Sequence, residues 1–281
     1  MKKIAVVTDS TAYMPEALVK KYDIHVIPVK IHWDDETLID GVDITPEQFY
    51  ERLGGSKTIP STSQPSAGEF LKLFDELSVD YDGIIAPLIS SGVSGTINSA
   101  EAALNLFSKV PVEIIDTHLA SSGSGMVVEQ TAKALAAGKT LNEARQTAED
   151  IAKKMKVFFV VDTLKYLHKG GRIGGASRYI GSALDIKPIL YLDDQGKIDA
   201  LEKVRSKKKA TARLVELAVE YADSRPVRVC VMHANVLEEI TNLQEQLLSQ
   251  LNCDHIDIYG ISPGVGVHVG PGAIGLAIYP I

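Results

Sequence analysis

Apolar runs alternate with amphipathic segments through the first half of the chain. Four runs are short and mainly apolar, as buried strands are: residues 4–7, 24–31, 84–89 and 112–115. The segments between and after them carry helix signals, including capping boxes at residues 45–48, 66–69 and 140–143. Strands that alternate with helices predict a parallel sheet covered by helices on both faces.

The pattern changes after residue 156. A strand is expected at 157–161, and residues 189–192 and 198 onward form a predicted hairpin joined by Asp193-Asp194-Gln195-Gly196. The other expected elements are helices at 206–222 and 237–248 and strands at 227–232 and 255–259. We therefore predict two domains: an α/β N-terminal domain with a parallel sheet at 1–156, and an α+β C-terminal domain with a mixed sheet at 157–281.

Residues 261–281 are strongly apolar and contain no Asp, Glu, Lys or Arg. Hydropathy alone would suggest a membrane-spanning helix for such a segment. Its five glycines and three prolines disfavour a helix in lipid. We expect a buried loop followed by a strand, and no stable membrane insertion.

The composition narrows the classes of partner. The chain has 281 residues and a net charge of -7, which argues against a nucleic-acid partner, because such a protein needs a basic surface. Lys207-Lys208-Lys209 is the only run of three basic residues and is typical of a solvated helix start. Cys230 and Cys253 lie beside apolar stretches, so we expect reduced core cysteines in a cytoplasmic protein.

Four hydroxyl side chains cluster in Ser61-Thr62-Ser63-Gln64-Pro65-Ser66, just before a predicted helix. Ser66 can cap that helix, with Glu69 as its capping-box partner. A hydroxyl-lined loop beside a helix N-terminus suits a carboxylate or a phosphate, because the helix dipole is positive there. An ordinary solvated turn explains the same residues, so this segment alone does not decide between the two.

A second loop of this kind, Ser90-Ser91-Gly92-Val93-Ser94-Gly95-Thr96, follows the strand expected at 84–89. It should lie at the carboxyl end of a parallel strand, where open α/β sheets bind ligands. Its glycines let backbone amides approach an anion, and Ser94 adds a hydroxyl donor. The spacing matches neither a P-loop nor a dinucleotide fingerprint, and a structural turn is the alternative.

Further candidates are isolated residues. Asp9-Ser10-Thr11 follows the first expected strand and either lines the same crevice or caps a turn. His268 lies among glycines and apolar residues, as a satisfied core residue or as the partner of a ligand's anionic group. Arg172, in a glycine-bracketed turn, and Arg205, between a strand and a helix, could contact an anion, an acidic partner surface or solvent.

Other site classes have little support. The seven histidines show no metal-ligand spacing and neither cysteine pairs with one, so we expect no metal. A nucleophile elbow around Ser94 would need its second glycine one residue after Gly95. We expect no catalytic residue and no cofactor.

Seven short blocks carry a family resemblance. They are Thr8-Asp9-Ser10, Thr62-Ser63-Gln64-Pro65-Ser66, Ser91-Gly92-Val93-Ser94-Gly95-Thr96, Lys169-Gly170-Gly171-Arg172-Ile173, Lys187-Pro188-Ile189-Leu190, Val204-Arg205-Ser206-Lys207-Lys208-Lys209 and His268-Val269-Gly270-Pro271-Gly272. In this order they resemble the DegV family, also known as the fatty-acid-binding subunits of bacterial fatty acid kinase. Ser206 stands where that family commonly has threonine, and Gly174 where it usually has serine; neither change removes a candidate anion ligand.

The resemblance implies a site and its ligand. One long-chain fatty acid is expected between the two domains, with its carboxylate bonded by Thr62 and Ser94 and with His268 close to it. Ser63, Gly95 and Thr96 belong to the same blocks and are expected in the ligand site. Arg172 and Arg205 are candidates for the face that meets the kinase.

The resemblance also implies a division of labour. A separate fatty acid kinase catalytic subunit supplies ATP and phosphorylates the bound carboxylate to an acyl phosphate, so this chain would be a lipid-binding, non-enzymatic subunit acting in phospholipid metabolism. Each buried methylene is worth about 0.8 kcal/mol, so a long acyl chain can bind with few polar contacts. A buried carboxylate without a cation would tend to take up a proton, which a charged His268 would offset.

Two other functions stay open from the sequence. The chain could be a stand-alone acyl hydrolase or transferase with Ser94 as nucleophile, although no general base is placed beside it in the sequence. It could also be a binding module for another small anion, such as a phosphorylated metabolite.

Overall fold

A parallel four-stranded sheet forms the first half of the molecule, in the order β2-β1-β6-β7. Its strands are β1 (Ile4–Asp9), β2 (Ile24–Ile27), β6 (Gly83–Leu88) and β7 (Val112–Asp116). Its helices are α1 (Glu16–Lys21), α3 (Ala67–Leu77), α4 (Thr96–Leu104), α5 (Ser122–Ala136) and α6 (Leu141–Lys154). The computed structural model describes residues 3–181 and 186–281.

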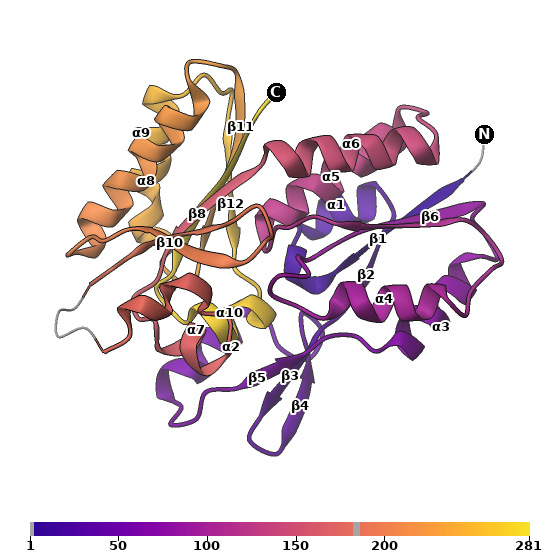
Figure 1. Cartoon of the computed structure of the whole chain (residues 1–281), viewed down its shortest axis with the longest axis horizontal. Helices are drawn as coiled ribbons and strands as arrows, with labels where there is room; N and C mark the ends of the chain where they lie inside the picture. Colours follow the sequence, from indigo (N-terminus) through magenta and orange to yellow (C-terminus); the bar gives the residue numbers. More distant parts are fainter. Residues whose placement is uncertain (1–2, 182–185) are drawn as a thin grey trace.

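Alternation along the strands decides which helices cover which face. Ala5 and Val7 on β1 belong to the same hydrophobic core as Phe70 of α3, while Val6 between them belongs to the core that includes Val128 of α5. In Figure 1, α3 and α4 accordingly lie on one side of the sheet, and α5 and α6 on the other. The predicted α/β arrangement is therefore confirmed.

A mixed six-stranded sheet forms the second half, in the order β10-β9-β8-β13-β11-β12. Its strands are β8 (Lys156–Val160), β9 (Ile189–Leu192), β10 (Ile198–Glu202), β11 (Val227–His233), β12 (Ile256–Gly260) and β13 (Ile274–Pro280). The helices α8 (Lys207–Ala222) and α9 (Leu237–Gln250) cover one face, and α5 lies against the other. This confirms the mixed sheet, whereas the division of the chain into domains at 156/157 stays a prediction.

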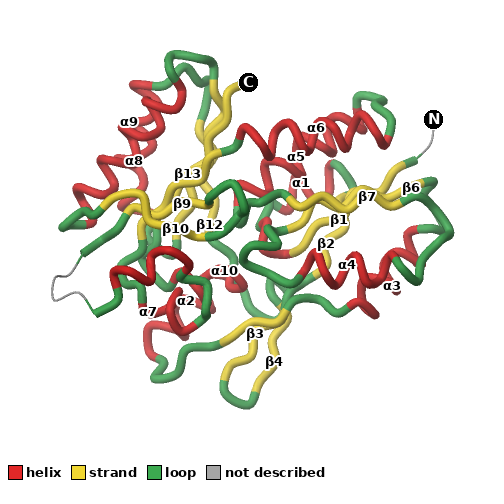
Figure 2. Tube along the Cα trace, in the orientation of Figure 1, coloured by secondary structure: helices red, strands yellow, loops and turns green. Residues whose placement is uncertain are grey.

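The expected strand at 24–31 is wrong as a single element. Pro28, which has no N–H to donate to a ladder, separates β2 from β3 (Lys30–Trp33). β3 belongs to a small antiparallel sheet in the order β4-β3-β5, with β4 (Glu36–Ile39) and β5 (Ser61–Ser63). Its β3–β4 hairpin projects at the bottom of Figure 2, and α2 (Pro46–Gly55) packs through Phe49 beside Trp33.

Two further predictions are corrected in detail. The hydroxyl segment at 61–66 is not a loop throughout, because its first three residues pair with β3 as β5. The apolar segment at 261–281 contains β13 as expected, but residues 263–269 form a short helix, α10 (Pro263–Val269), capped by Ser262. Among the described residues, none of the helices is long and apolar enough to cross a membrane.

The remaining elements are short. They are α7 (Lys165–Lys169) and the 3-10 turns η1 (Ser10–Ala12) and η2 (Gly174–Tyr179). The three predicted capping boxes are all present, at the starts of α2, α3 and α6. Local sequence signals therefore set these three helix starts.

A buried ion pair links the two large sheets. Glu129 on α5 is 5% exposed, and its Oε2 lies 3.2 Å from Nη2 of Arg228 on β11. Arg228 Nη2 also lies 3.2 Å from Asp257 Oδ2. We expect Glu129→Ala to lower the free energy of unfolding by about 3 kcal/mol, because a half-paired guanidinium stays buried. Urea unfolding of the native and variant chains measures this.

The exposed pair of Arg145 and Glu149 on α6 provides the matched control. It is an (i, i+4) pair in water, so Glu149→Ala should lower the free energy of unfolding by only about 0.5 kcal/mol or less. Equal, small losses in the two variants would contradict a structural role for the Glu129 pair.

Candidate functional site

A cavity lies where the parallel strands end against the inner face of the six-stranded sheet. The space between its lining atoms is about 940 Å³, including the part that opens to solvent. We call it the central cavity; its lining comprises Thr11, Val29, Thr62, Ser63, Gln64, Ile89, Val93, Ser94, Ala120, Ser121, Val157, Phe159, Leu167, Arg172, Leu192, Ile198, Met232, Ile261, Gly264, Val265, His268, Val269 and Ala273. Such a position, at the carboxyl ends of parallel strands, is the usual ligand site of open α/β sheets.

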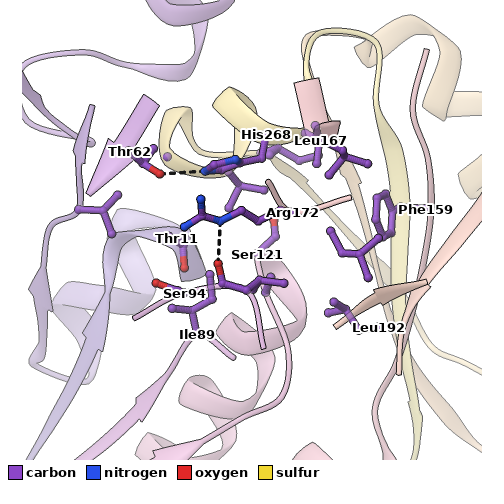
Figure 3. A pocket seen from close by; sticks show the side chains of 18 of the residues that line it. Thr11, Thr62, Ile89, Ser94, Ser121, Phe159, Leu167, Arg172, Leu192 and His268 are labelled. Atoms are coloured by element: carbon purple, nitrogen blue, oxygen red, sulfur yellow. Dashed lines mark hydrogen bonds between the residues drawn. The ribbon is translucent and has the colours of Figure 1, made fainter. Parts of the chain in front are cut away.

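The wall of the central cavity is polar on one side and apolar on the other. In Figure 3, Thr62, Arg172, Ser94 and Thr11 gather on one side. Apolar side chains from the six-stranded sheet, such as Phe159, lie on the other. A ligand that fills the cavity therefore needs a polar end and an apolar body.

A hydrogen bond between Thr62 and His268 lies at the polar side. Thr62 is the middle residue of β5 and His268 is on α10; their Oγ1 and Nε2 atoms are 2.8 Å apart. The two residues are 206 positions apart in the chain. The structure thus brings together two of the residues predicted from separate sequence blocks.

His268 is neutral at physiological pH. Burial, and then the nearby charge of Arg172, lower the pKa of its imidazole to about 4. The alternative of a charged His268, considered from the sequence, therefore does not fit this site. If Nε2 carries the ring proton and donates it to Thr62, the Thr62 hydroxyl proton is left to donate to a ligand.

Arg172 supplies the positive charge instead. Its Nε donates to the carbonyl oxygen of Val93 at 3.0 Å, which is where the dashed line from Arg172 ends in Figure 3. Its Nη1 donates to the carbonyl oxygen of Gly170 at 2.6 Å. These two bonds fix the guanidinium on the cavity wall, so its charge faces the polar side. Its predicted contact with a partner protein stays untested.

Gly170 in the Lys169-Gly170-Gly171-Arg172 block has a steric reason to be glycine. A Cβ at this position would lie 2.2 Å from Nδ1 of His268, far closer than atoms approach. The glycine therefore lets the turn after α7 press against the imidazole. The same turn carries Arg172, so one backbone segment positions both the histidine and the guanidinium.

The second predicted loop places Ser94 on the cavity wall. Ser94 Oγ and Thr96 Oγ1 are 2.9 Å apart, and the amide of Thr96 donates to Ser94 Oγ at 3.3 Å. Gly95 and Thr96, predicted as ligand residues, lie behind the wall: Thr96 is fully buried, and Gly95 packs closely against the Gln64 side chain. They support Ser94.

Ser63 and Arg205 take different positions. Ser63 lines the cavity, but its hydroxyl is 2.8 Å from Nε2 of His32 on β3. Arg205 is exposed just before Ser206, the residue that caps α8. It lies outside the cavity wall, on the surface where a partner could reach it.

Three polar residues that line the cavity are not among the ligand residues predicted from the sequence. Thr11 fits both of the interpretations that the sequence left open: its hydroxyl donates to Asp9, which caps η1, and the residue also lines the cavity. Gln64 and Ser121 line it without having been predicted. Gln64 lies within the hydroxyl segment at 61–66, so the hydroxyl residues beside it could have indicated it. No comparable sequence pattern marks Ser121.

Asp40 anchors the helix that carries His268. Its Oδ1 accepts from the amide of Gly264 at 3.2 Å and its Oδ2 from the hydroxyl of Ser10 at 2.7 Å. Burial raises the pKa of Asp40 to about 7. A carboxyl from the N-terminal half thus holds the start of α10, and α10 in turn places His268.

Comparisons with known proteins agree with this architecture. The family model described as "Uncharacterised protein, DegV family" matches residues 3–281. Protein DegV of Bacillus subtilis is 36% identical over 277 residues, covering 97% of this chain and 98% of that protein. These matches extend along nearly the whole chain, including both large sheets.

Solved structures give the same result. A DegV family protein from Thermus thermophilus, described by its fatty acid binding, superposes with a TM-score of 0.93 at 30% identity, over 99% of this chain and 100% of that one. A stearic acid-binding protein from Eubacterium ventriosum superposes with a TM-score of 0.89 at 26% identity, over 100% and 98%. The likeness therefore includes the sheets and helices that form the central cavity.

The pKa of His268 predicts how stability depends on pH. Above its ordinary value of 6.5 the imidazole is neutral in folded and unfolded chains, so its contribution to stability is complete. As the pH falls from about 6.5 to about 4, the unfolded chain binds a proton that the folded chain does not, and the free energy of unfolding declines. Urea unfolding across this range should show a decline that His268→Gln reduces.

Subtracting the pH dependence of the free energy of unfolding of His268→Gln from that of the native chain isolates the contribution of His268. The raised pKa of Asp40 acts in the opposite direction, since its contribution is lost as pH rises through about 7, and it is common to both chains. An NMR titration of the His268 ring gives an independent check. A midpoint near 6.5 would show that the imidazole is not desolvated as described.

Proposed function

The chain belongs to the DegV family, and on that premise we propose that it binds one long-chain fatty acid in the central cavity, between the two large sheets. The observation that carries the proposal is the cavity itself, which is apolar over most of its wall and polar at one side. A DegV family protein described by its fatty acid binding and a structurally similar stearic acid-binding protein support the choice of ligand.

The apolar wall accounts for the affinity expected of such a ligand. Val157, Phe159, Leu192 and Met232 offer it hydrocarbon surface. Burying ten methylenes would contribute about 8 kcal/mol, at about 0.8 kcal/mol each. The loss of the ligand's translational, rotational and conformational entropy offsets part of this binding free energy. Because the acyl chain supplies most of the affinity, the main role of the head-group contacts is to orient the ligand.

The polar side accounts for the head group. We assign the hydroxyls of Thr62 and Ser94 as donors to the carboxylate, with Arg172 as the nearby positive charge. The cation favours the ionised form, which removes the difficulty of a carboxylate buried without a counter-charge. His268 acts through Thr62: as a neutral donor it turns the threonine hydroxyl toward the ligand.

The bound carboxylate is then presented to a separate kinase. We propose that such a subunit transfers phosphate from ATP to a carboxylate oxygen, forming an acyl phosphate, and that this chain only holds the substrate. The absence of a P-loop or dinucleotide fingerprint in the sequence supports this division. Arg205, exposed near the start of α8, is proposed as part of the face that meets the kinase. A cytoplasmic location stays a prediction.

The alternative of a stand-alone acyl hydrolase or transferase receives less support. Activating Ser94 would require a general base at its hydroxyl. Within the described part of the chain, Ser94 Oγ bonds only to Thr96, while His268 bonds to Thr62. A binding module for another small anion would leave the apolar wall without a role.

Direct analysis of bound lipid tests the proposal. The purified chain should release fatty acid into an organic extract analysed by mass spectrometry and, once stripped, should take up palmitate or oleate. Thr62→Val keeps the shape of the side chain but removes the hydroxyl. Because a hydrogen bond to a charged group is worth about 1.5–3 kcal/mol, palmitate affinity should fall about 10- to 100-fold.

Ser63→Ala is the matched control, one residue along the same strand. Its hydroxyl is bonded to His32, so we expect palmitate affinity to stay within about twofold of native. A loss as large as that of Thr62→Val would place Ser63 on the ligand, as the sequence suggested. A native chain that holds no fatty acid and takes none up would overturn the proposed function.

The kinase face has its own test. Arg205→Glu reverses a charge on the surface, outside the cavity lining. We expect unchanged palmitate affinity but at least about a tenfold lower rate of acyl phosphate formation with a matching kinase and ATP, because a like-charge contact opposes docking. An unchanged rate would remove Arg205 from the proposed face.

A further inference from the structure

Ser121 lines the central cavity, and its buried hydroxyl is satisfied by no described residue. The side chain is 4% exposed, and its Oγ makes no hydrogen bond within the described structure. Buried hydroxyls in proteins are normally bonded, so this one calls for an explanation.

The backbone at Ser121 is also unusual. Ser121 is the residue before α5, a helix of 15 residues, where a serine usually takes an extended conformation and caps the first turn. Ser66 and Thr140 do so at the starts of α3 and α6. Ser121 instead has φ 54 and ψ -144, and its side chain makes no capping bond. The strained backbone leaves the hydroxyl unused by the helix.

The contacts of its chain neighbours place Ser121 between two parts of the cavity wall. On one side of Ser121 in the chain, the carbonyl of Leu119 accepts from the amide of Ser90, at the base of the loop that carries Ser94. On the other side, Gly123 packs against Val157, so closely that a Cβ there would lie 2.8 Å from its Cγ2. Ser121 is thus in the segment that joins the base of the Ser94 loop to the apolar side of the cavity, and Figure 3 shows it among the lining residues.

An unsubstituted alkyl chain that passes this point would bury the hydroxyl against methylenes, which cannot bond to it. A chain that carries an oxygen at this point would satisfy it. Building on the proposed function, we propose that Ser121 is a specificity residue: it hydrogen-bonds a hydroxyl or keto oxygen borne by the acyl chain close to its carboxylate. The preferred ligands are then long-chain fatty acids with an oxygen on the second or third carbon.

Competition binding to the lipid-stripped chain, with a fluorescent fatty acid as reporter, tests this. Four probes are compared: palmitate, 2-hydroxypalmitate, 3-hydroxypalmitate and 16-hydroxypalmitate. At least one of the 2- and 3-hydroxy acids should bind about 10-fold or more tightly than palmitate, because a site built to bond an oxygen discriminates against the ligand that lacks it. The 16-hydroxy acid carries the same group at the far end and should gain nothing.

Two substitutions remove the hydroxyl in different ways. Ser121→Ala keeps a Cβ on the strained backbone, whereas Ser121→Gly also relieves the strain, so at least the glycine variant should fold as stably as the native chain. Both should abolish the preference for the hydroxy acid. Ser122→Ala is the matched control: this neighbouring serine is also buried with a hydroxyl that makes no hydrogen bond within the described structure, but it lies beside Cys230 and outside the cavity lining. It should keep the preference.

The outcomes separate this inference from the proposed function. Equal affinities of the native chain for palmitate and for the 2- and 3-hydroxy acids would overturn the inference and leave the fatty-acid proposal standing. If Ser121→Ala weakened palmitate and hydroxypalmitate by the same factor, Ser121 would be a carboxylate ligand and not a specificity residue. A chain that binds none of the four probes would overturn the proposed function, and the inference with it.

Discussion

The contact between α10 and the small antiparallel sheet is the constraint on which the site depends. The bond from Thr62 to His268 joins positions 206 residues apart and closes the cavity at its polar side. Asp40 holds the start of α10 through the amide of Gly264, and Tyr50 donates to the carbonyl of Ile261 at 3.1 Å. Together with the turn at Gly170, these bonds fix the imidazole relative to the strand that carries Thr62.

The charges around this contact follow from its burial. An imidazole enclosed beside Arg172 stays neutral, so it serves as an oriented donor and not as a cation. Backbone carbonyls of Val93 and Gly170 hold the Arg172 guanidinium in place. The result is a single fixed positive group beside neutral hydroxyls, an arrangement that suits one carboxylate better than a multiply charged phosphate.

Local signals in the sequence predicted much of the fold. The alternation of apolar runs with capped helices was sufficient for both large sheets, because each strand and helix start carries its own pattern of side chains. The small sheet was not predicted, since Pro28 divides what reads as one apolar run and β5 consists of three hydroxyl residues. The glycines of α10 predicted a loop. Gly264 and Gly266 instead lie in a helix, where the side chains of Asp40 and Tyr50 pack so closely that a Cβ at these positions would not fit.

The sequence by itself determined the fold class and the two hydroxyl blocks, because these depend on residue types and short spacings, and the ordered set of family blocks indicated Thr62, Ser94 and His268 as candidate ligand residues. Only the tertiary structure decided which of them meet. It placed Arg172 on the cavity wall, made His268 neutral and brought Ser121 into the lining. The physical reason is that burial and proximity, which set charge states and contacts, arise between segments far apart in the chain and leave no local pattern to read.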